Sequence, residues 1–269
     1  MRKLLIFLLV IGYAVGSEIR LLSQNFYPAG LNIIEIKNPE NTKILIETES
    51  KTVYFPANSE KSFFAIPYAC KKLAILNVIK DNRVIYRKFI RIKPKKYPVS
   101  RITVKERKKT EKILKRIINE YKLIRKILSK YTPKKFKETE FIKPVKNPKV
   151  STPFGAKRVI NRKKKSIHWG IDYKAPKGTP VFASLSGKVV LAKELFYTGK
   201  TVIIDHGLCL YTLYAHLSKI KVKENQHVKG GEIIGNVGST GRSTGPHLHF
   251  GVYLCGERVD PDLAFRLKL

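Results

Sequence analysis

The chain has few cysteines. Only three occur in 269 residues: Cys70, Cys209 and Cys255. An odd number leaves at least one thiol unpaired, which excludes a fully paired disulfide framework as the source of stability. Cys209 and Cys255 both fall in the C-terminal region, so a disulfide between them is an alternative if their strands are neighbours. We expect instead that they are small buried hydrophobic residues.

Acidic residues are also scarce. Asp and Glu number 20 against 54 Lys and Arg, which gives a formal net charge of +34. Such an excess indicates a polyanionic partner, namely nucleic acid, an anionic membrane or the anionic polymers of a cell wall. It specifies neither a fold nor a chemistry.

Long apolar runs are absent after the first residues. Arg2-Lys3 precedes an apolar run from Leu4 to Tyr13, and Ala14-Val15-Gly16 offers small residues for cleavage. This pattern predicts a signal peptide over residues 1–16, with an uncleaved anchor as the alternative. We therefore expect an exported protein of the periplasm or cell envelope. Anionic envelope polymers are then expected partners, and nucleic acid is not.

Residues 17–100 alternate short apolar runs with turn signals such as Asn38-Pro39 and Asp81-Asn82. Six or seven short strands at this spacing predict a β-sandwich-like domain. The segment contains no histidine and no catalytic constellation. We interpret it as a targeting or spacer domain.

In residues 101–150 the spacing of apolar residues changes. Apolar residues recur every three or four positions between Lys105 and Lys130, which predicts a long amphipathic helix that ends before Thr132-Pro133. Its polar face is basic, so binding to a membrane surface is an alternative to the packing against a neighbouring domain that we expect. Residues 134–150 read as an extended linker because of Pro144 and Pro148.

Residues 151–269 return to short strands separated by glycine turns, which predicts an all-β domain. The whole chain is therefore predicted to be mainly β. Two segments in this region carry the chemistry: His168-Trp169-Gly170-Ile171-Asp172, and Pro246-His247-Leu248-His249. Alternate residues of a strand share a face, so His247 and His249 project together, as do His168, Gly170 and Asp172 if that segment is extended. Three imidazoles and one carboxylate on strand faces suit zinc, and two His with one Asp leave the open position of a catalytic site.

A series of short motifs follows in order along this domain: Thr152-Pro153-Phe154-Gly155, His168 to Tyr173, Ala175 to Val181, Ile204-Asp205-His206-Gly207, Tyr211 to Leu217, Gly235 to Gly241, Gly245 to Phe250 and Val259-Asp260-Pro261. The helical metalloprotease motif HExxH is absent. This series resembles that of the lysostaphin-type (LytM-like) zinc metallopeptidases, which cut the peptides of peptidoglycan. The N-terminal part resembles, more loosely, the module that precedes the peptidase in some Gram-negative members.

The resemblance implies a role for each site residue. His168, Asp172 and His249 would bind one zinc ion per chain. His216 and His247 would be catalytic, facing the attacking water or the developing oxyanion. His206 is either structural or in contact with substrate, and His227 is expected to be a solvated loop residue.

Together these inferences predict an exported zinc endopeptidase that hydrolyses the peptide cross-links of peptidoglycan. The alternative is a non-enzymatic or latent regulator of other cell-wall hydrolases, since some members of the family have lost metal ligands. This chain keeps all of them. The sequence leaves the oligomeric state and the bond cleaved undetermined.

Overall fold

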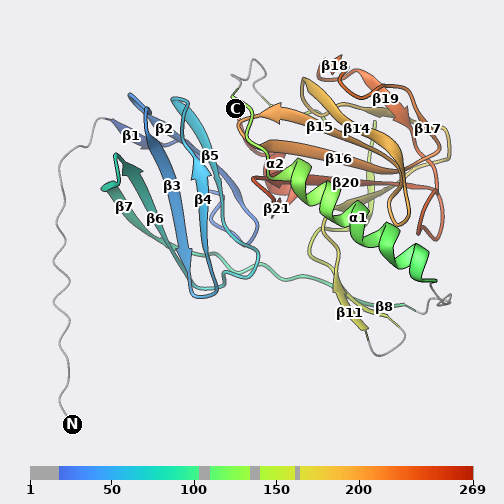
Figure 1. Cartoon of the computed structure of the whole chain (residues 1–269). Coiled ribbons are helices and arrows are strands. Elements are labelled where there is room, and N and C mark those ends of the chain that lie inside the picture. Colours follow the sequence, from blue (N-terminus) through green and yellow to red (C-terminus); the bar gives the residue numbers. More distant parts are fainter. Residues whose placement is uncertain (1–17, 103–109, 134–139, 161–163, 269) are drawn as a thin grey trace, which may run out of the picture.

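The structure is a computed structural model that describes residues 18–102, 110–133, 140–160 and 164–268 (Figure 1). The predicted signal peptide, residues 1–16, lies outside these residues. The described part of the chain contains 21 strands and two helices. The prediction of a mainly β protein is therefore confirmed.

The N-terminal strands form two small antiparallel sheets, one in the order β1-β2-β5 and one in the order β4-β3-β6-β7 (Figure 1). Burial alternates along β3, where Ile44 and Ile46 point into the core, as expected for a strand with one covered face. The strands are β1 Ile19–Leu21, β2 Leu31–Ile36, β3 Thr42–Thr48, β4 Thr52–Pro56, β5 Lys61–Ala65, β6 Leu73–Lys80 and β7 Arg83–Arg91.

Helix α1, Glu111–Leu128, lies within the span predicted to be helical, whose first residues fall in the undescribed segment 103–109. The Thr110 side chain caps its N-terminus by accepting a hydrogen bond from the amide of Ile113 at 3.3 Å. The helix lies across one face of a large sheet in the C-terminal part (Figure 1). No helix among the described residues is long and apolar enough to span a membrane.

That large sheet has eight strands in the order β18-β14-β15-β16-β20-β12-β9, with β21 also paired to β20. Its central strand β16 is buried along its whole length, since α1 and the core cover its two faces. The strands are β9 Lys149–Thr152, β12 Ile171–Lys174, β14 Gly187–Leu195, β15 Gly199–Gly207, β16 Leu210–Leu217, β18 His227–Val228, β20 His247–Leu254 and β21 Glu257–Val259.

Two three-stranded sheets flank the large one, in the orders β11-β10-β8 and β13-β19-β17. The boundary drawn in the sequence between residues 150 and 151 falls within β9. Strand β8 comes from the chain well before that boundary and pairs in parallel with β10. The remaining strands are β8 Val99–Ile102, β10 Lys157–Ile160, β11 Lys164–Ile167, β13 Pro180–Phe182, β17 Lys219–Ile220 and β19 Ile233–Asn236.

The expectation that the C-terminal domain is entirely β needs a small correction. A four-residue helix, α2, spans Pro261–Ala264. The carboxylate of Asp260 caps it by accepting from the amide of Asp262 at 3.0 Å, and Pro261 occupies the first turn, where its missing N–H costs nothing. These are ordinary helix-start residues that a search for apolar periodicity overlooks in so short an element.

The N-terminal sheets and the large sheet share one continuous hydrophobic core. Asn25 donates to the carbonyl of Leu263 at 3.3 Å, and the amide of Asp260 donates to the carbonyl of Ala29 at 2.9 Å. The fully buried Asp260 carboxylate also pairs with the ammonium of Lys95. The two parts of the chain are therefore packed as one body.

The expectation that Cys209 and Cys255 are unpaired is wrong, because they form a disulfide. Leu210 and Leu254 are register partners on β16 and β20, and the two cysteines are the next residues outward. The amide of Cys255 also donates to the carbonyl of Cys209 at 2.9 Å. Strand pairing thus brings together two thiols that lie 46 residues apart in the sequence, while Cys70 stays free and buried.

Candidate metal centre

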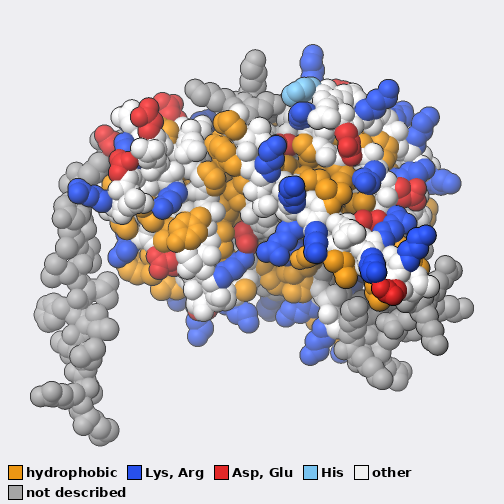
Figure 2. Space-filling model, in the orientation of Figure 1, with side chains coloured by type: hydrophobic (Ala, Val, Ile, Leu, Met, Phe, Trp, Pro, Cys, Tyr) orange, Lys and Arg blue, Asp and Glu red, His pale blue; other side chains and the backbone are white. Residues whose placement is uncertain are grey.

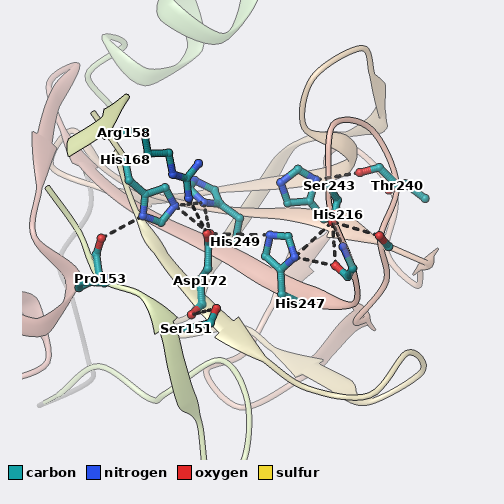
Figure 3. Close-up of polar contacts among 12 residues, drawn as sticks. Ser151, Pro153, Arg158, His168, Asp172, His216, Thr240, Ser243, His247 and His249 are labelled. Carbon is teal, nitrogen blue, oxygen red and sulfur yellow. Dashed lines mark hydrogen bonds and ion pairs between the residues drawn. The ribbon is translucent and has the colours of Figure 1, made fainter. Parts of the chain in front are cut away.

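The register of three neighbouring strands assembles the candidate site. On β20, His249 stands directly opposite Asp172 of β12 on one side and opposite Ala215 of β16 on the other. His216 follows Ala215. His247 lies two residues before His249 and so shares its face of the sheet. Side chains from three separate segments therefore meet at one place (Figure 3).

His168 reaches the same place from the segment just before β12. Gly170 makes this approach possible, because a Cβ there would lie 2.7 Å from the Cε1 atom of His249 and 2.4 Å from the carbonyl oxygen of Phe250. The Nδ1–H of His168 donates to the carbonyl of Pro153 at 3.0 Å. This bond fixes the ring so that Nε2 faces the other site residues.

Three ligand atoms converge. His168 Nε2 and His249 Nδ1 each lie 2.8 Å from Asp172 Oδ1 and 3.0 Å from each other. Adjacent ligands of tetrahedral zinc are roughly 3.3 Å apart, given Zn–N and Zn–O bonds of about 2.0–2.1 Å. Small outward shifts would therefore admit the ion.

The two other imidazoles, His216 and His247, stand to the right of this group in Figure 3. The ring centroids of His216 and His247 are 4.8 Å apart. Each ring donates its Nδ1–H to a carbonyl at 2.8 Å, His216 to Thr240 and His247 to Gly245. Both are thereby held in the tautomer that leaves Nε2 unprotonated, and His247 Nε2 lies 3.8 Å from Asp172 Oδ1.

Burial and polar contacts shift the pKa values of three residues of the site. Burial lowers the pKa of His216 to about 4, against a smaller opposing effect of the hydrogen bond to Thr240. Burial likewise lowers the pKa of His249. At Asp172 burial alone would raise the pKa, but the contacts with His168 and His249 outweigh it and hold the pKa well below its usual value. Neutral imidazoles and an ionised carboxylate are the forms that bind a metal.

Residues 166–261 match the model of peptidase family M23. The chain carries an M23 peptidase domain. The match begins just before His168 and ends just after Asp260, so it contains all five predicted site residues.

Individual relatives agree with this assignment. The chain is 45% identical over 120 residues to the DD-carboxypeptidase/endopeptidase Mpg of Neisseria meningitidis serogroup B, covering 45% of this chain and 28% of the relative. It is 42% identical over 113 residues to the peptidoglycan DD-endopeptidase ShyA of Vibrio cholerae, covering 42% and 26%. The chain thus spans about a quarter of the length of these curated relatives.

A solved structure extends the likeness beyond the M23 domain. A crystal structure of an M23 peptidase from Pseudomonas aeruginosa superposes with a TM-score of 0.67 at 29% identity, covering 89% of this chain and 95% of the other. Coverage of this extent includes the N-terminal sheets. Their attachment to the M23 domain is therefore shared with that protein.

Analysis of the sequence missed Arg158. This residue of β10 donates from a terminal guanidinium nitrogen to Asp172 Oδ2 at 3.0 Å (Figure 3). It stands among basic residues that include Lys157 and Lys164-Lys165, so neither charge nor periodicity distinguished it. Its position after Phe154-Gly155, one of the motifs, was the only available signal.

The two remaining histidines, His206 and His227, lie in different environments. His206 is fully buried, with Nδ1 3.0 Å from the carbonyl of Ser186 and Nε2 2.7 Å from the hydroxyl of Thr212, so it is placed for a structural role. His227 is exposed on β18, as expected of a solvated residue. The segment Gly238 to Gly245 supplies the carbonyls that orient His216 and His247.

Proposed function

We propose that the chain is an exported zinc endopeptidase that hydrolyses peptide cross-links of peptidoglycan. The observation that carries the proposal is the convergence of His168 Nε2, Asp172 Oδ1 and His249 Nδ1 beside two further oriented imidazoles, within an M23 domain. The relatives with 45% and 42% identity are named as enzymes acting on DD bonds, one of them on peptidoglycan. This supports a D,D cross-link as the substrate.

In this proposal His168, Asp172 and His249 hold the zinc ion. Two neutral nitrogens and one carboxylate oxygen leave a coordination position for water or substrate. A zinc ion held by these residues would supply polarisation of the scissile carbonyl and a lowered pKa of water. Arg158 holds the outer oxygen of Asp172, so that the carboxylate presents only Oδ1 to the ion.

His216 and His247 handle protons. With Nδ1–H donated to a carbonyl, Nε2 of each ring is free to accept a proton from the attacking water and to return it to the leaving amine. The low pKa of His216 keeps it neutral at neutral pH. A ring that has already given Nδ1–H to a carbonyl cannot rotate without losing that bond, so its Nε2 stays directed.

The other parts of the chain are assigned supporting roles. We propose that residues 1–16 direct export, that residues 17–100 form a β-sandwich-like targeting or spacer domain, and that residues 101–150 connect it to the catalytic domain at 151–269. The alternative of a latent regulator is less well supported, because the side chains of His247 and His249 each keep 16% of their surface exposed. In the part of the chain that the structure describes, solvent therefore reaches these two side chains of the site.

The test is digestion of purified sacculi by residues 17–269, with analysis of the released muropeptides. Wild type should remove cross-linked dimers, whereas a chelated sample and His249→Ala should not, and zinc should restore the chelated sample. His227→Ala is the matched control, since it removes an exposed imidazole outside the site. A wild-type protein that binds zinc but leaves the dimers intact would refute the endopeptidase and favour the regulator.

The net charge of +34 is proposed to hold the enzyme on anionic envelope polymers. Such attraction is screened within about 8 Å at physiological ionic strength and within about 3 Å at 1 M salt. Sacculus binding should therefore weaken strongly in high salt. Binding that is unchanged in 1 M NaCl would rule out this contribution.

A further inference from the structure

Helix α1 is fixed to the M23 domain along one side. Ile124, Ile127 and Leu128 pack into a cluster on the large sheet that includes Leu213. In the middle of the helix, the Glu120 carboxylate accepts from the amide of Phe196 at 2.8 Å. These contacts fix which side of α1 faces away from the domain.

A second apolar stripe on α1 is left uncovered. Leu114, Ile118 and Tyr121 are 45%, 51% and 58% exposed. At about 100° per residue these three positions fall within an arc of about 60°, beside the arc that faces the domain. They therefore form one continuous strip along the N-terminal two-thirds of the helix.

Cations lie next to this strip. Lys122, Arg125 and Lys126 are exposed and have no carboxylate partner among the described residues, while Lys115 pairs with Glu111 at 2.8 Å. In Figure 2, which views the molecule from the side of α1, Lys and Arg side chains stand beside hydrophobic ones over this helix. The other acid of the helix, Glu120, is turned to the domain. The outward surface of α1 thus combines an apolar strip with unneutralised positive charge.

We propose that this surface docks on an anionic lipid bilayer. A helix that lies in the membrane interface needs both elements, apolar side chains that enter the acyl boundary and Lys or Arg that meet lipid headgroups. Binding to a polyanionic polymer would need only the cations and would not account for the exposed apolar strip of Leu114, Ile118 and Tyr121. A second copy of this chain also carries a net charge of +34, and this like charge opposes self-association.

The test is co-sedimentation of residues 17–269 with vesicles of phosphatidylcholine alone or with one-quarter phosphatidylglycerol. Wild type should bind the anionic vesicles and not the neutral ones. The triple variant Leu114→Ser, Ile118→Ser, Tyr121→Ser should bind them at least about tenfold more weakly, because three partly inserting side chains are lost. Its binding to sacculi and its hydrolysis should stay unchanged, since none of the three belongs to the catalytic machinery.

A matched control removes apolar side chains of similar exposure elsewhere. Leu73, Phe89 and Tyr54, on the four-stranded sheet, are 45%, 54% and 57% exposed. The triple Leu73→Ser, Phe89→Ser, Tyr54→Ser should keep vesicle binding. Loss of binding in this control alone, or equal binding by wild type and the helix triple, would overturn the proposal.

A second variant covers the case in which the helix triple loses its fold by circular dichroism. Lys122→Glu combined with Lys126→Glu reverses charge at two exposed positions and should also abolish binding to anionic vesicles. Retained binding in this variant would contradict docking through α1. Loss of sacculus binding together with vesicle binding in the helix triple, which keeps all its charges, would assign the surface to a polymer. Because vesicle binding needs no catalysis, these results stand apart from those of the hydrolysis assay.

Discussion

The guanidinium of Arg158 and the carboxylate of Asp172 meet at 3.0 Å through Asp172 Oδ2, whereas Oδ1 faces His168 and His249 at 2.8 Å. The two oxygens of one carboxylate thus serve different partners. Since Asp172 is largely buried, the charge-assisted bond from Arg158 is what holds its plane in the orientation that directs Oδ1 to the metal position.

Arg158→Met should therefore weaken zinc binding. Residues that orient a metal ligand typically contribute about 10- to 100-fold to affinity. Arg158→Lys should recover only part of this, because an ammonium lacks the planar fork of Arg. Competition with a chelator measures the affinity, and Lys157→Met, an exposed change on the same strand, is the control. Equal zinc affinity in wild type and Arg158→Met would contradict this role.

His216 has a backbone φ of 61°, in the left-handed region that Asn tolerates better than Ala. His216→Asn and His216→Ala should both lose hydrolysis by about 10²–10⁴-fold, the usual contribution of a general base. The Ala variant should in addition be less stable to unfolding by about 1 kcal/mol. At positive φ the Cβ atom crowds the backbone, and Ala lacks the polar side chain with which Asn offsets this cost by local hydrogen bonding. Urea unfolding of both variants checks this. Substantial activity in His216→Asn would exclude a proton-transfer role.

The stability of the metal-free protein should fall in mild acid partly because of His216. Its folded pKa of about 4 lies below the value of 6.5 for a free imidazole, so the unfolded chain binds more protons between these values. The contribution is fully present above pH 6.5 and is lost as the pH falls from 6.5 toward 4. Urea unfolding at pH 7 and pH 5 should show a loss smaller by about 1–2 kcal/mol in His216→Asn than in wild type. An identical pH dependence in the two proteins would disagree with this expectation.

Lys95 supports the buried Asp260 at the contact between the N-terminal part and the M23 domain. Burial raises the pKa of Asp260, and Lys95 opposes that effect. Lys95→Met leaves the buried Asp260 carboxylate without its cation and should lower the free energy of unfolding by about 2–3 kcal/mol at pH 7. The loss should shrink toward pH 4, because a protonated Asp260 needs no cation. Lys96→Met, at the exposed neighbouring position, is the control for denaturation measured at both pH values.

The disulfide closes a loop of 46 residues that contains much of the M23 domain. Cys209→Ser with Cys255→Ser should lower the free energy of unfolding by about 2–4 kcal/mol, mainly because the unfolded chain gains freedom. A reducing agent should reproduce this loss in wild type and have no effect on the double variant. Unfolding curves of wild type that are the same with and without reductant would show that the bond contributes nothing to stability.

The residues of the site could be predicted from the sequence, but their arrangement could not. Alternation within β20 sufficed to place His247 and His249 on one face, and the motifs supplied His168, Asp172 and His216. The pairing of Asp172 with His249 joins strands 77 residues apart, and no local pattern encodes that register.

Other features could not be predicted from the sequence for related reasons. The Cys209–Cys255 bond depends on the register of two strands, which no local pattern encodes, and the odd cysteine count is satisfied by the free Cys70. Lys95 and Asp260 become a pair only after segments 165 residues apart in the sequence have packed together. Local sequence gives the elements and their capping residues, whereas contacts across long separations come from the packing of the whole chain.

The docking of Asn25 and Ala29 against Leu263 and Asp260 has a consequence for biogenesis. Asn25 and Leu263 lie 238 residues apart, so their contact forms only after the whole segment between them has been synthesised. Until then Asn25 and Ala29 lack these partners. Closing a loop of this length makes the contact a late and slow event in folding. The N-terminal sheets therefore reach their final packing no earlier than the M23 domain against which they lie.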